Sequence, residues 1–137
     1  MIKEIVKDTA FLSKKSTPAT QDDLYIGQDL RDTLAANKDR CVGMAANMVG
    51  YLKNIIIFED SDESVKVMYN PKLVKKSVPY KAVESCLSLE GERPTTRYRK
   101  ITVRYFDENF KRCEKSYTDF TAQIIQHELD HLQGILI

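Results

Sequence analysis

Apolar residues recur at helical spacing near both ends of the chain. In the N-terminal third, two acidic residues precede a periodic apolar set made up of Leu24, Ile26, Leu30 and Leu34. This pattern predicts a helix over about residues 22–36, because acidic side chains stabilise the positive end of the helix dipole. Near the other end, a second helix is expected over about residues 119–133, with Gly134 as its stop. Its expected buried side consists of Phe120, Ile124, Leu129 and Leu132.

The segment between these helices has the pattern of β-strands. Short runs rich in Val, Ile and Tyr predict strands at 55–59, 65–70 and 72–77, with Asn70-Pro71 and Val78-Pro79 as breaks. Residues 100–107 alternate between two faces, and a turn at 107–109 leads to a partner strand at 110–117. The buried face of that alternation is expected to hold Ile101, Val103 and Tyr105. A helix, several antiparallel strands and a terminal helix together predict an α+β fold in which the strands pack around the C-terminal helix.

Length and composition are those of an ordinary globular protein. The chain has 137 residues, of which 42% are hydrophobic and 30% charged, so we expect one domain spanning residues 1–137. The longest apolar run, at residues 55–58, is far too short to span a bilayer, and the N-terminus has no secretory signal. We therefore expect a cytoplasmic protein without a membrane partner. Three cysteines are an odd number, which argues against a disulfide framework.

Charge is distributed unevenly although the net charge is only +1. Residues 66–115 contain 13 Lys and Arg against 6 Asp and Glu, and the rest of the chain is acidic. Such a basic segment suits RNA or an acidic substrate, or it is a solvated sheet face whose lysines keep strand edges apart. Because no aromatic-rich RNA-binding signature accompanies the charge, the solvated face is favoured and no sequence-specific nucleic-acid partner is expected.

The C-terminal helix carries the sequence His127-Glu128-Leu129-Asp130-His131, which is an H-E-x-x-H pattern. Positions i and i+4 lie about 40° apart around a helix and roughly 6 Å apart along it, so two imidazoles can reach one metal ion. Glu128 would then stand beside an open coordination site and handle protons. The alternative is that the two histidines, the only ones in the chain, are merely satisfied on a helix face.

A third metal ligand has to come from upstream, because neither an imidazole nor a carboxylate follows His131. The segment Glu84-Ser85-Cys86-Leu87-Ser88 offers a thiol between a carboxylate and two hydroxyls. A thiolate with two imidazoles leaves a fourth, open position on a tetrahedral metal ion. The alternative for Cys86 is an inert buried residue. Cys41 and Cys113 lack such a context, and we interpret them as packing residues.

These residues resemble the peptide deformylase family, whose three motifs occur here in the family's order. Residues 126–134 match the third motif, Q-H-E-x-D-H-L-x-G, without a departure. Residues 84–88 match the second, E-G-C-L-S, except that Ser85 stands in the Gly position. Residues 41–50 match the first, G-x-G-L-A-A-x-Q-x-G, with three changes: Cys41 for Gly, Met44 for Leu and Met48 for Gln.

The resemblance implies a deformylase-like α+β fold and a metal-dependent hydrolase. Its reaction would remove the formyl group from the N-terminal formyl-Met of nascent polypeptides, which makes a formyl-Met peptide the expected partner and the ribosome a candidate neighbour. The implied metal ligands are Cys86, His127 and His131. The family's native ion is Fe²⁺, and Zn²⁺, Ni²⁺ or Co²⁺ can occupy the same site.

The resemblance also implies roles for residues around the metal. Glu128 would take a proton from the attacking water and deliver it to the departing amine. The Leu87 backbone N–H would help the metal hold the oxyanion, and Gly43 would lie along the substrate backbone. Glu84 would support a metal ligand through a hydrogen bond, and Arg93 or Arg97 would meet the peptide chain.

Met48 is the departure with the largest chemical consequence. The family's Gln donates a hydrogen bond to the developing oxyanion, which a thioether cannot do, and loss of such a donor typically costs about 10²–10³ in rate. Asn47 has an amide, but in a helical turn it points about 100° away from position 48. Either Asn47 is re-aimed, a water substitutes, or catalysis is slow. The alternative functions are a deformylase-like metal- and peptide-binding protein with weak or no turnover, and a hydrolase of another N-acyl substrate.

Overall fold

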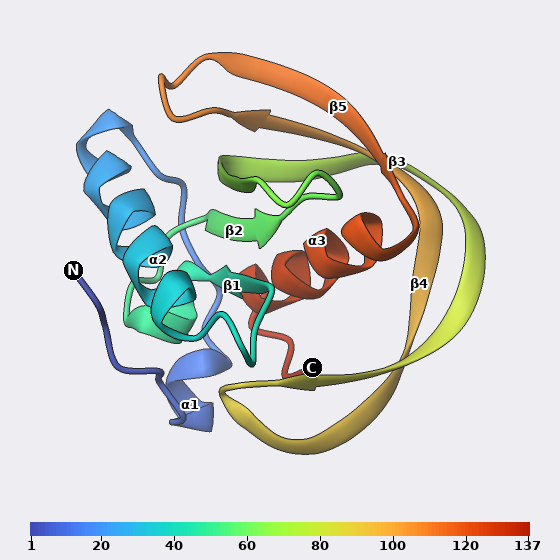
Figure 1. The fold of residues 1–137 in the computed structure, drawn as a ribbon, viewed down its shortest axis with the longest axis horizontal. Helices are drawn as coiled ribbons and strands as arrows, with labels where there is room; N and C mark the ends of the chain where they lie inside the picture. The colour runs from blue at the N-terminus through green and yellow to red at the C-terminus, as the bar shows by residue number, and fades with distance from the viewer.

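Five strands form one antiparallel sheet in the order β1-β2-β3-β4-β5. Figure 1 shows this arrangement in a computed structural model that describes residues 1–137. The strands are β1 (Gly43–Ala45), β2 (Ile55–Glu59), β3 (Val65–Cys86), β4 (Leu89–Phe106) and β5 (Arg112–Thr118). The helices are α1 (Thr9–Leu12), α2 (Leu24–Ala36) and α3 (Asp119–Leu132), with 3-10 turns at Gln21–Asp23 and Ala46–Val49.

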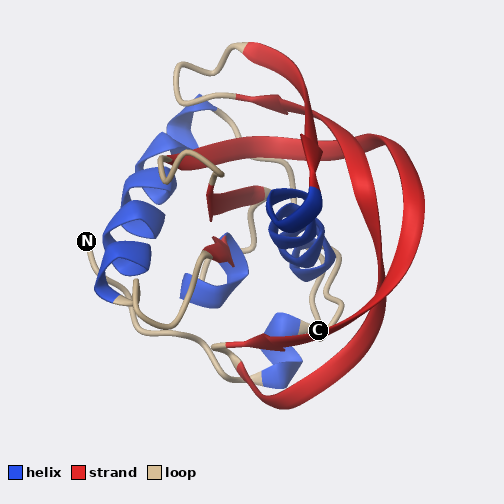
Figure 2. Cartoon of the chain, turned by 45° about the vertical axis from the view of Figure 1, so that its right-hand side comes forward, coloured by secondary structure: helices blue, strands red, loops and turns tan.

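The sheet curls around α3, and α2 covers its other side. The long strands β3 and β4 bend past the helix, so that α3 lies inside the curve of the sheet (Figure 2). Strand β2 is buried on both faces: Ile55 and Ile57 belong to the apolar cluster with α2, and Ile56 and Phe58 to the cluster with α3. Burial on both faces explains why this strand is a continuous apolar run instead of an alternating one.

Helix α3 confirms the prediction for the C-terminal segment, except on its first turn. The helix ends at Leu132, and Gly134 follows with a φ of +77°. A Cβ at Gly134 would lie 2.3 Å from the Ser13 carbonyl oxygen, so both the backbone conformation and the space require glycine. The expected burial of Phe120 is wrong, because its side chain is 61% exposed on the first turn. Ile124 and Leu132 are buried as expected, and Leu129 is partly buried.

Helix α2 begins after a capped 3-10 turn. Thr20 and Asp23 form a capping box in which the Asp23 side chain accepts a hydrogen bond from the Thr20 backbone N–H at 2.8 Å. The helix then runs to Ala36, which agrees with the predicted end. Its buried side, including Ile26 and Leu30, packs on β1, β2 and the turn at Ala46–Val49.

The prediction of two strands separated at Asn70-Pro71 is wrong, because β3 continues through both prolines. The register with β4 shifts between Tyr69 and Lys72, and Asn70 has a φ of +54°. Such a bulge accommodates Asn70-Pro71, which would interrupt a regular ladder because proline has no backbone N–H to donate. The Asn70 side chain holds the bulge in place: it accepts from the Ala19 N–H at 2.7 Å and donates to the Ala19 carbonyl at 2.9 Å. Val78 has a φ of +63°, yet the pairing resumes at Pro79.

Strand β4 is longer than predicted, whereas its buried face is the predicted one. It begins at Leu89 instead of residue 100, and β5 begins at Arg112 instead of residue 110. Ile101, Val103 and Tyr105 are buried, which confirms the alternation. None of the helices has the length and apolar character needed to span a membrane.

Candidate metal centre and active site

Helix α3 presents two imidazoles and a carboxylate on its buried side. His127 and His131 lie one turn apart, with ring centroids separated by 4.5 Å. Both rings and the Glu128 side chain are buried against the sheet. The amphipathic pattern of the helix dictates this placement, because the same side of α3 carries the apolar residues Ile124 and Leu132 into the core.

Cys86 reaches the two histidines from the last residue of β3. The chain turns at Leu87 and Ser88, and Cys86 pairs with Leu89 across this turn. One ligand atom each from Cys86, His127 and His131 lie within 4.8 Å of one another. The structure therefore brings together the three residues predicted as metal ligands, although they are far apart in sequence.

The hydrogen bonds of the two imidazoles fit a metal site. His127 Nδ1 donates to Glu84 Oε1 at 2.8 Å, which leaves its Nε2 for the contact with Cys86. His131 Nε2 lies 3.2 Å from the Ile137 main-chain oxygen, and its Nδ1 lies 3.1 Å from Glu128 Oε1. Burial would lower the pKa of His131, but Glu128 and Cys86 raise it well above 6.5, so both ring nitrogens carry protons in the metal-free protein. A thiol and two imidazoles held in place by hydrogen bonds are a donor set suited to a divalent transition-metal ion that replaces these protons.

Without a metal ion, the three donors share protons among themselves. Burial would raise the pKa of the Cys86 thiol, but hydrogen bonds with His127 and His131 outweigh it and lower this pKa to about 7. Burial would lower the pKa of His127, but the contacts with Cys86 and Glu84 raise it to about 9. The thiolate is thus stabilised by neighbouring positive charge, which a divalent cation would supply in place of the protons.

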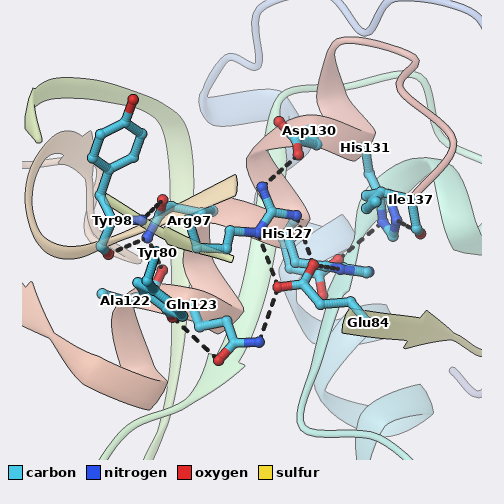
Figure 3. Close-up of polar contacts among 12 residues, drawn as sticks. Tyr80, Glu84, Arg97, Tyr98, Ala122, Gln123, His127, Asp130, His131 and Ile137 are labelled. Carbon is cyan, nitrogen blue, oxygen red and sulfur yellow. Dashed lines mark hydrogen bonds and ion pairs between the residues drawn. The ribbon is translucent and has the colours of Figure 1, made fainter. Parts of the chain in front are cut away.

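Glu84 joins His127 to a buried charge network (Figure 3). Arg97 donates to both Glu84 oxygens, at 2.9 and 2.7 Å, and its third nitrogen donates to Asp130 at 2.7 Å. Gln123 adds a donor to Glu84 at 3.0 Å. Burial would raise the pKa of Glu84, but His127 and Arg97 hold it at about 2, so this carboxylate stays ionised. Glu84 therefore holds the position expected of a residue that supports a metal ligand.

The expected contact of Arg97 with the peptide chain is wrong, because Arg97 is only 3% exposed and its guanidinium is committed to Glu84 and Asp130. Arg93 donates to the Glu90 carbonyl and does not line the pocket described next. Arg97 is the counter-charge of the buried Glu84 carboxylate and of Asp130, whose side chain is 28% exposed.

A pocket of about 370 Å³ opens beside the metal ligands. Seven residues to which the sequence assigns a role line it: Gly43, Met48, Glu84, Cys86, Leu87, His127 and Glu128. Cys41 and Ser85, two of the positions that depart from the motifs, also line it. Sequence reasoning missed six further lining residues: Arg40, Val42, Val83, Phe120, Gln123 and Ile124. A large apolar residue such as Phe120 carries the same pattern whether it faces a core or a pocket, so no sequence signal separated the two.

Comparisons with known proteins agree with this geometry. The family model for polypeptide deformylase matches residues 2–137. The chain is 52% identical to a peptide deformylase of Clostridium beijerinckii, and the alignment covers all of both chains. It is 35% identical to peptide deformylase 2 of Clostridium acetobutylicum, covering 96% of this chain and 89% of that protein. This chain belongs to the peptide deformylase family.

Solved deformylase structures share the fold. A class I type b peptide deformylase from Acinetobacter baumannii, in its Met-Ala-Ser-bound crystal structure, has a TM-score of 0.88 at 26% identity, with 99% of this chain and 97% of that chain covered. The peptide deformylase from Ehrlichia chaffeensis has a TM-score of 0.87 at 29% identity, with 99% of this chain and 86% of that chain covered. The predicted deformylase-like α+β fold is thereby confirmed.

Met48 supplies no side-chain hydrogen-bond donor at the Gln position of the family motif. Met48 is 1% exposed and lines the pocket, so a thioether stands at the Gln position. Asn47 is not re-aimed toward the pocket: its Nδ2 donates to the His131 carbonyl oxygen at 3.0 Å. Of the three options that the sequence left open, a re-aimed Asn47 is thus excluded.

Ser85 replaces the glycine of the deformylase motif without backbone strain. It is absent from the residues with positive φ, so the conformational freedom of glycine is not required at this position. Its exposed side chain lies at the pocket. The pairing of β3 with β4 shifts register between Glu84 and Cys86, so Ser85 lies at a bulge and its side chain forms part of the pocket surface.

Gly43 leaves room for Glu128, which makes Gly43→Ala a test of the site geometry. A Cβ there would lie 2.7 Å from Ile124 Cγ2 and 3.1 Å from Glu128 Oε2. Because a small displacement of a catalytic group can cost about 10²-fold in rate, we expect Gly43→Ala to lower kcat/KM for a formyl-Met tripeptide by about 10–10²-fold. Steady-state kinetics and the melting temperature check this. A variant with full activity would show that Glu128 tolerates the added methyl group.

Cys41 is expected to resist alkylation although it lines the pocket. Its Sγ donates to the Gly43 carbonyl at 2.8 Å, and burial raises the pKa of this thiol from 9.0 to about 12. Only the thiolate reacts, so at pH 8 iodoacetamide should modify Cys41 about 10³-fold more slowly than an ordinary thiol. The rate should keep rising with pH beyond 10. Peptide mass spectrometry measures it, with urea-unfolded protein as the control, and equal rates in both states would contradict the assignment.

Proposed function

We propose that this chain is a metal-dependent deformylase that removes the formyl group from the N-terminal formyl-Met of nascent polypeptides, acting as one domain over residues 1–137. The observation that carries the proposal is the convergence of Cys86, His127 and His131, with Glu128 beside them in one pocket. Membership of the deformylase family supports it. A Met-Ala-Ser peptide bound to the Acinetobacter relative supports a product that begins with methionine.

Cys86, His127 and His131 would hold the metal ion, and we propose Fe²⁺, with Zn²⁺, Ni²⁺ or Co²⁺ as substitutes. When bound, a divalent ion at this position would polarise the formyl carbonyl and increase the acidity of water. The hydrogen bond from His127 to Glu84 fixes the ring that would bind it, and Arg97 in turn fixes Glu84.

Glu128 would transfer the proton in this reaction. Its buried carboxylate lines the pocket beside the ligand group, with Oε1 3.1 Å from His131 Nδ1, and from this position it would accept a proton from the attacking water. The water oxygen bonds to the formyl carbon, and the bond from that carbon to the peptide nitrogen then breaks. Glu128 returns its proton to the departing nitrogen. The products are formate and a peptide with a free amino terminus, so the atoms balance.

The substrate would lie along the edge strand β1. This strand pairs only with β2, so its other edge can pair with an extended peptide at Gly43. Val42, Phe120 and Ile124 give the pocket an apolar wall that suits the methionine side chain. The Leu87 N–H, at the turn after Cys86, is the proposed backbone donor to the oxyanion.

We propose that the protein acts in the cytoplasm and meets its substrates near the ribosome, because formyl-Met is the first residue of newly synthesised chains. The reaction can be assayed without ribosomes, because a short formylated peptide presents both the scissile bond and the methionine side chain to the pocket.

A second candidate is hydrolysis of another N-acyl group, which the thioether of Met48 favours because it changes the oxyanion side of the pocket. The two candidates are separated by offering formyl-, acetyl- and propionyl-Met-Ala-Ser to metal-loaded protein and measuring the released acid. The deformylase proposal expects formyl to be the clear favourite. Preference for a larger acyl group would establish the second candidate. No release from any peptide, with metal bound stoichiometrically, would leave a binding protein.

Met48→Gln is expected to raise kcat for formyl-Met-Ala-Ser. It would restore a donor whose loss typically costs about 10²–10³ in rate, so we expect a gain of at least about tenfold. Met48→Leu is the matched control, because it keeps the apolar volume and adds no donor. Equal kcat values for Met48→Gln and the parent protein would show that another group or a water already serves the oxyanion.

A further inference from the structure

A groove of about 650 Å³ is lined by residues of strands β3, β4 and β5. Ile101 packs into the apolar cluster with α3, so by alternation Lys100 and Thr102 point outward, away from α3. The side chains on this outer side of the sheet groove are two lysines and four hydroxyl residues: Lys75, Lys100, Ser77, Thr102, Ser116 and Thr118. Lys76 also borders the groove, but it lies opposite Ile101, and its Nζ is 4.7 Å from the centroid of the Tyr98 ring.

The strand register places cations and hydroxyls side by side across the groove. Lys100 on β4 lies directly opposite Ser77 on β3 and Thr118 on β5. Thr102 lies opposite Lys75 and Ser116, and its hydroxyl is 2.9 Å from that of Ser116. Side chains paired in this way are about 5 Å apart, and diagonal neighbours about 7–8 Å apart. Lys75 and Lys100 are such a diagonal pair.

The positive charge of the sheet groove is not neutralised within the chain. Neither Lys75 nor Lys100 forms an ion pair, and no carboxylate lines the groove. The acidic residues nearest along the strands have other partners: Glu114 is 3.0 Å from Arg104, and Asp119 is 3.7 Å from Arg99. Clustered like charges are unfavourable in an isolated sheet, so the arrangement fits an anionic partner better than a bare solvated face.

The side-chain chemistry selects among anionic partners. Lysines bind phosphates as point charges, and serine and threonine hydroxyls can both donate to and accept from the 2′-hydroxyl groups of RNA. The groove lacks a platform for stacking bases, because its one aromatic residue, Tyr117, packs edge-on against Phe58 at a centroid distance of 5.7 Å. Single-stranded binders use such platforms, whereas duplex RNA is held through phosphates and 2′-hydroxyls.

We propose that the sheet groove binds the sugar–phosphate backbone of double-stranded RNA without reading its base sequence. The proposal rests on the register and the charge of β3, β4 and β5 and does not depend on the proposed deformylase activity. No groove residue lines the pocket beside Cys86, so the two sites can be tested independently.

The test compares two double variants by the fluorescence anisotropy of a labelled 20-base-pair RNA duplex at several salt concentrations. The first replaces the outward groove lysines: Lys75→Gln and Lys100→Gln. The matched control, Lys7→Gln and Lys38→Gln, removes the same charge from exposed lysines outside the groove. Each phosphate contact contributes about 0.9 to the slope of log K against log salt. The groove variant should therefore lose about 2 from this slope and at least about tenfold in affinity, while the control stays close to the parent protein.

Several results would overturn the proposal. They are an equal loss in both variants, the absence of RNA binding by the parent protein, equal affinity for a DNA duplex of the same sequence, or lysine-dependent binding to phosphatidylserine vesicles without binding to RNA. Formate release from a formyl-Met tripeptide is measured for every variant. It should be unchanged, so a failure of the RNA proposal and a failure of the proposed function are read separately.

Discussion

Replacing Glu128 with glutamine is expected to lower kcat/KM for formyl-Met-Ala-Ser by about 10²–10⁴-fold, the usual contribution of a positioned proton-transfer group. Glutamine keeps the shape of the side chain but cannot accept a proton. Glu128 is 4% exposed and lines the pocket, with its Oε1 3.1 Å from His131 Nδ1. Stopped-time assays of formate measure the loss.

The metal content of Glu128→Gln should equal that of the parent protein, because the ligand group consists of Cys86, His127 and His131. Glu92→Gln, an exposed substitution on β4, is the matched control and should keep full activity. Activity of Glu128→Gln within about tenfold of the parent protein would contradict the assigned proton transfer. Loss of both metal and activity would place Glu128 among the groups that hold the ion.

Arg97→Met is expected to destabilise the metal-free protein by about 3–5 kcal/mol, the usual cost of removing one partner from a buried charge network. Methionine keeps much of the volume and removes the guanidinium. Glu84 would lose two donors, at 2.9 and 2.7 Å, and Asp130 would lose one at 2.7 Å. Since Arg97 is 3% exposed, water cannot simply replace these donors.

Arg104→Met is the matched control for Arg97→Met, because Arg104 pairs with Glu114 at 3.0 Å with both side chains more than 40% exposed. Such a pair contributes about 0–1 kcal/mol. Urea unfolding at pH 7 gives both free energies of unfolding. Similar values for the two variants would show that the Glu84–Arg97–Asp130 network contributes no more to stability than an exposed pair.

Local sequence patterns predicted the secondary structure and the ligand spacing that depend on residues close together in the sequence. The periodicity and the glycine stop defined α3, and the spacing of His127 and His131 on it placed two ligands one turn apart. The absence of a ligand after His131 placed the third ligand upstream, and the carboxylate and hydroxyls around Cys86 favoured it over Cys41 and Cys113. In each of these cases, the physics lies within one helix or one short motif.

Long-range pairing decided what the sequence did not reveal. Pro71 and Pro79 look like strand breaks, but pairing with β4 carries β3 past both, helped by the side chain of Asn70. Arg97 looks like a surface cation, but Glu84 and Asp130 from other elements make its burial favourable. Phe120 matches the apolar side of α3, yet the sheet leaves its turn uncovered at the pocket. A single sequence does not show which distant residues pack against one another, so these three features could not be predicted from it.

The measurement that tests the central claim most directly is formate release from formyl-Met-Ala-Ser by one preparation of protein, assayed anaerobically as stripped of metal, after reloading with Fe²⁺, and after reloading Cys86→Ala. The account predicts release by the reloaded parent protein only. Equal release by stripped and reloaded protein, or undiminished release by Cys86→Ala, would contradict a metal-dependent deformylase built on Cys86, His127 and His131.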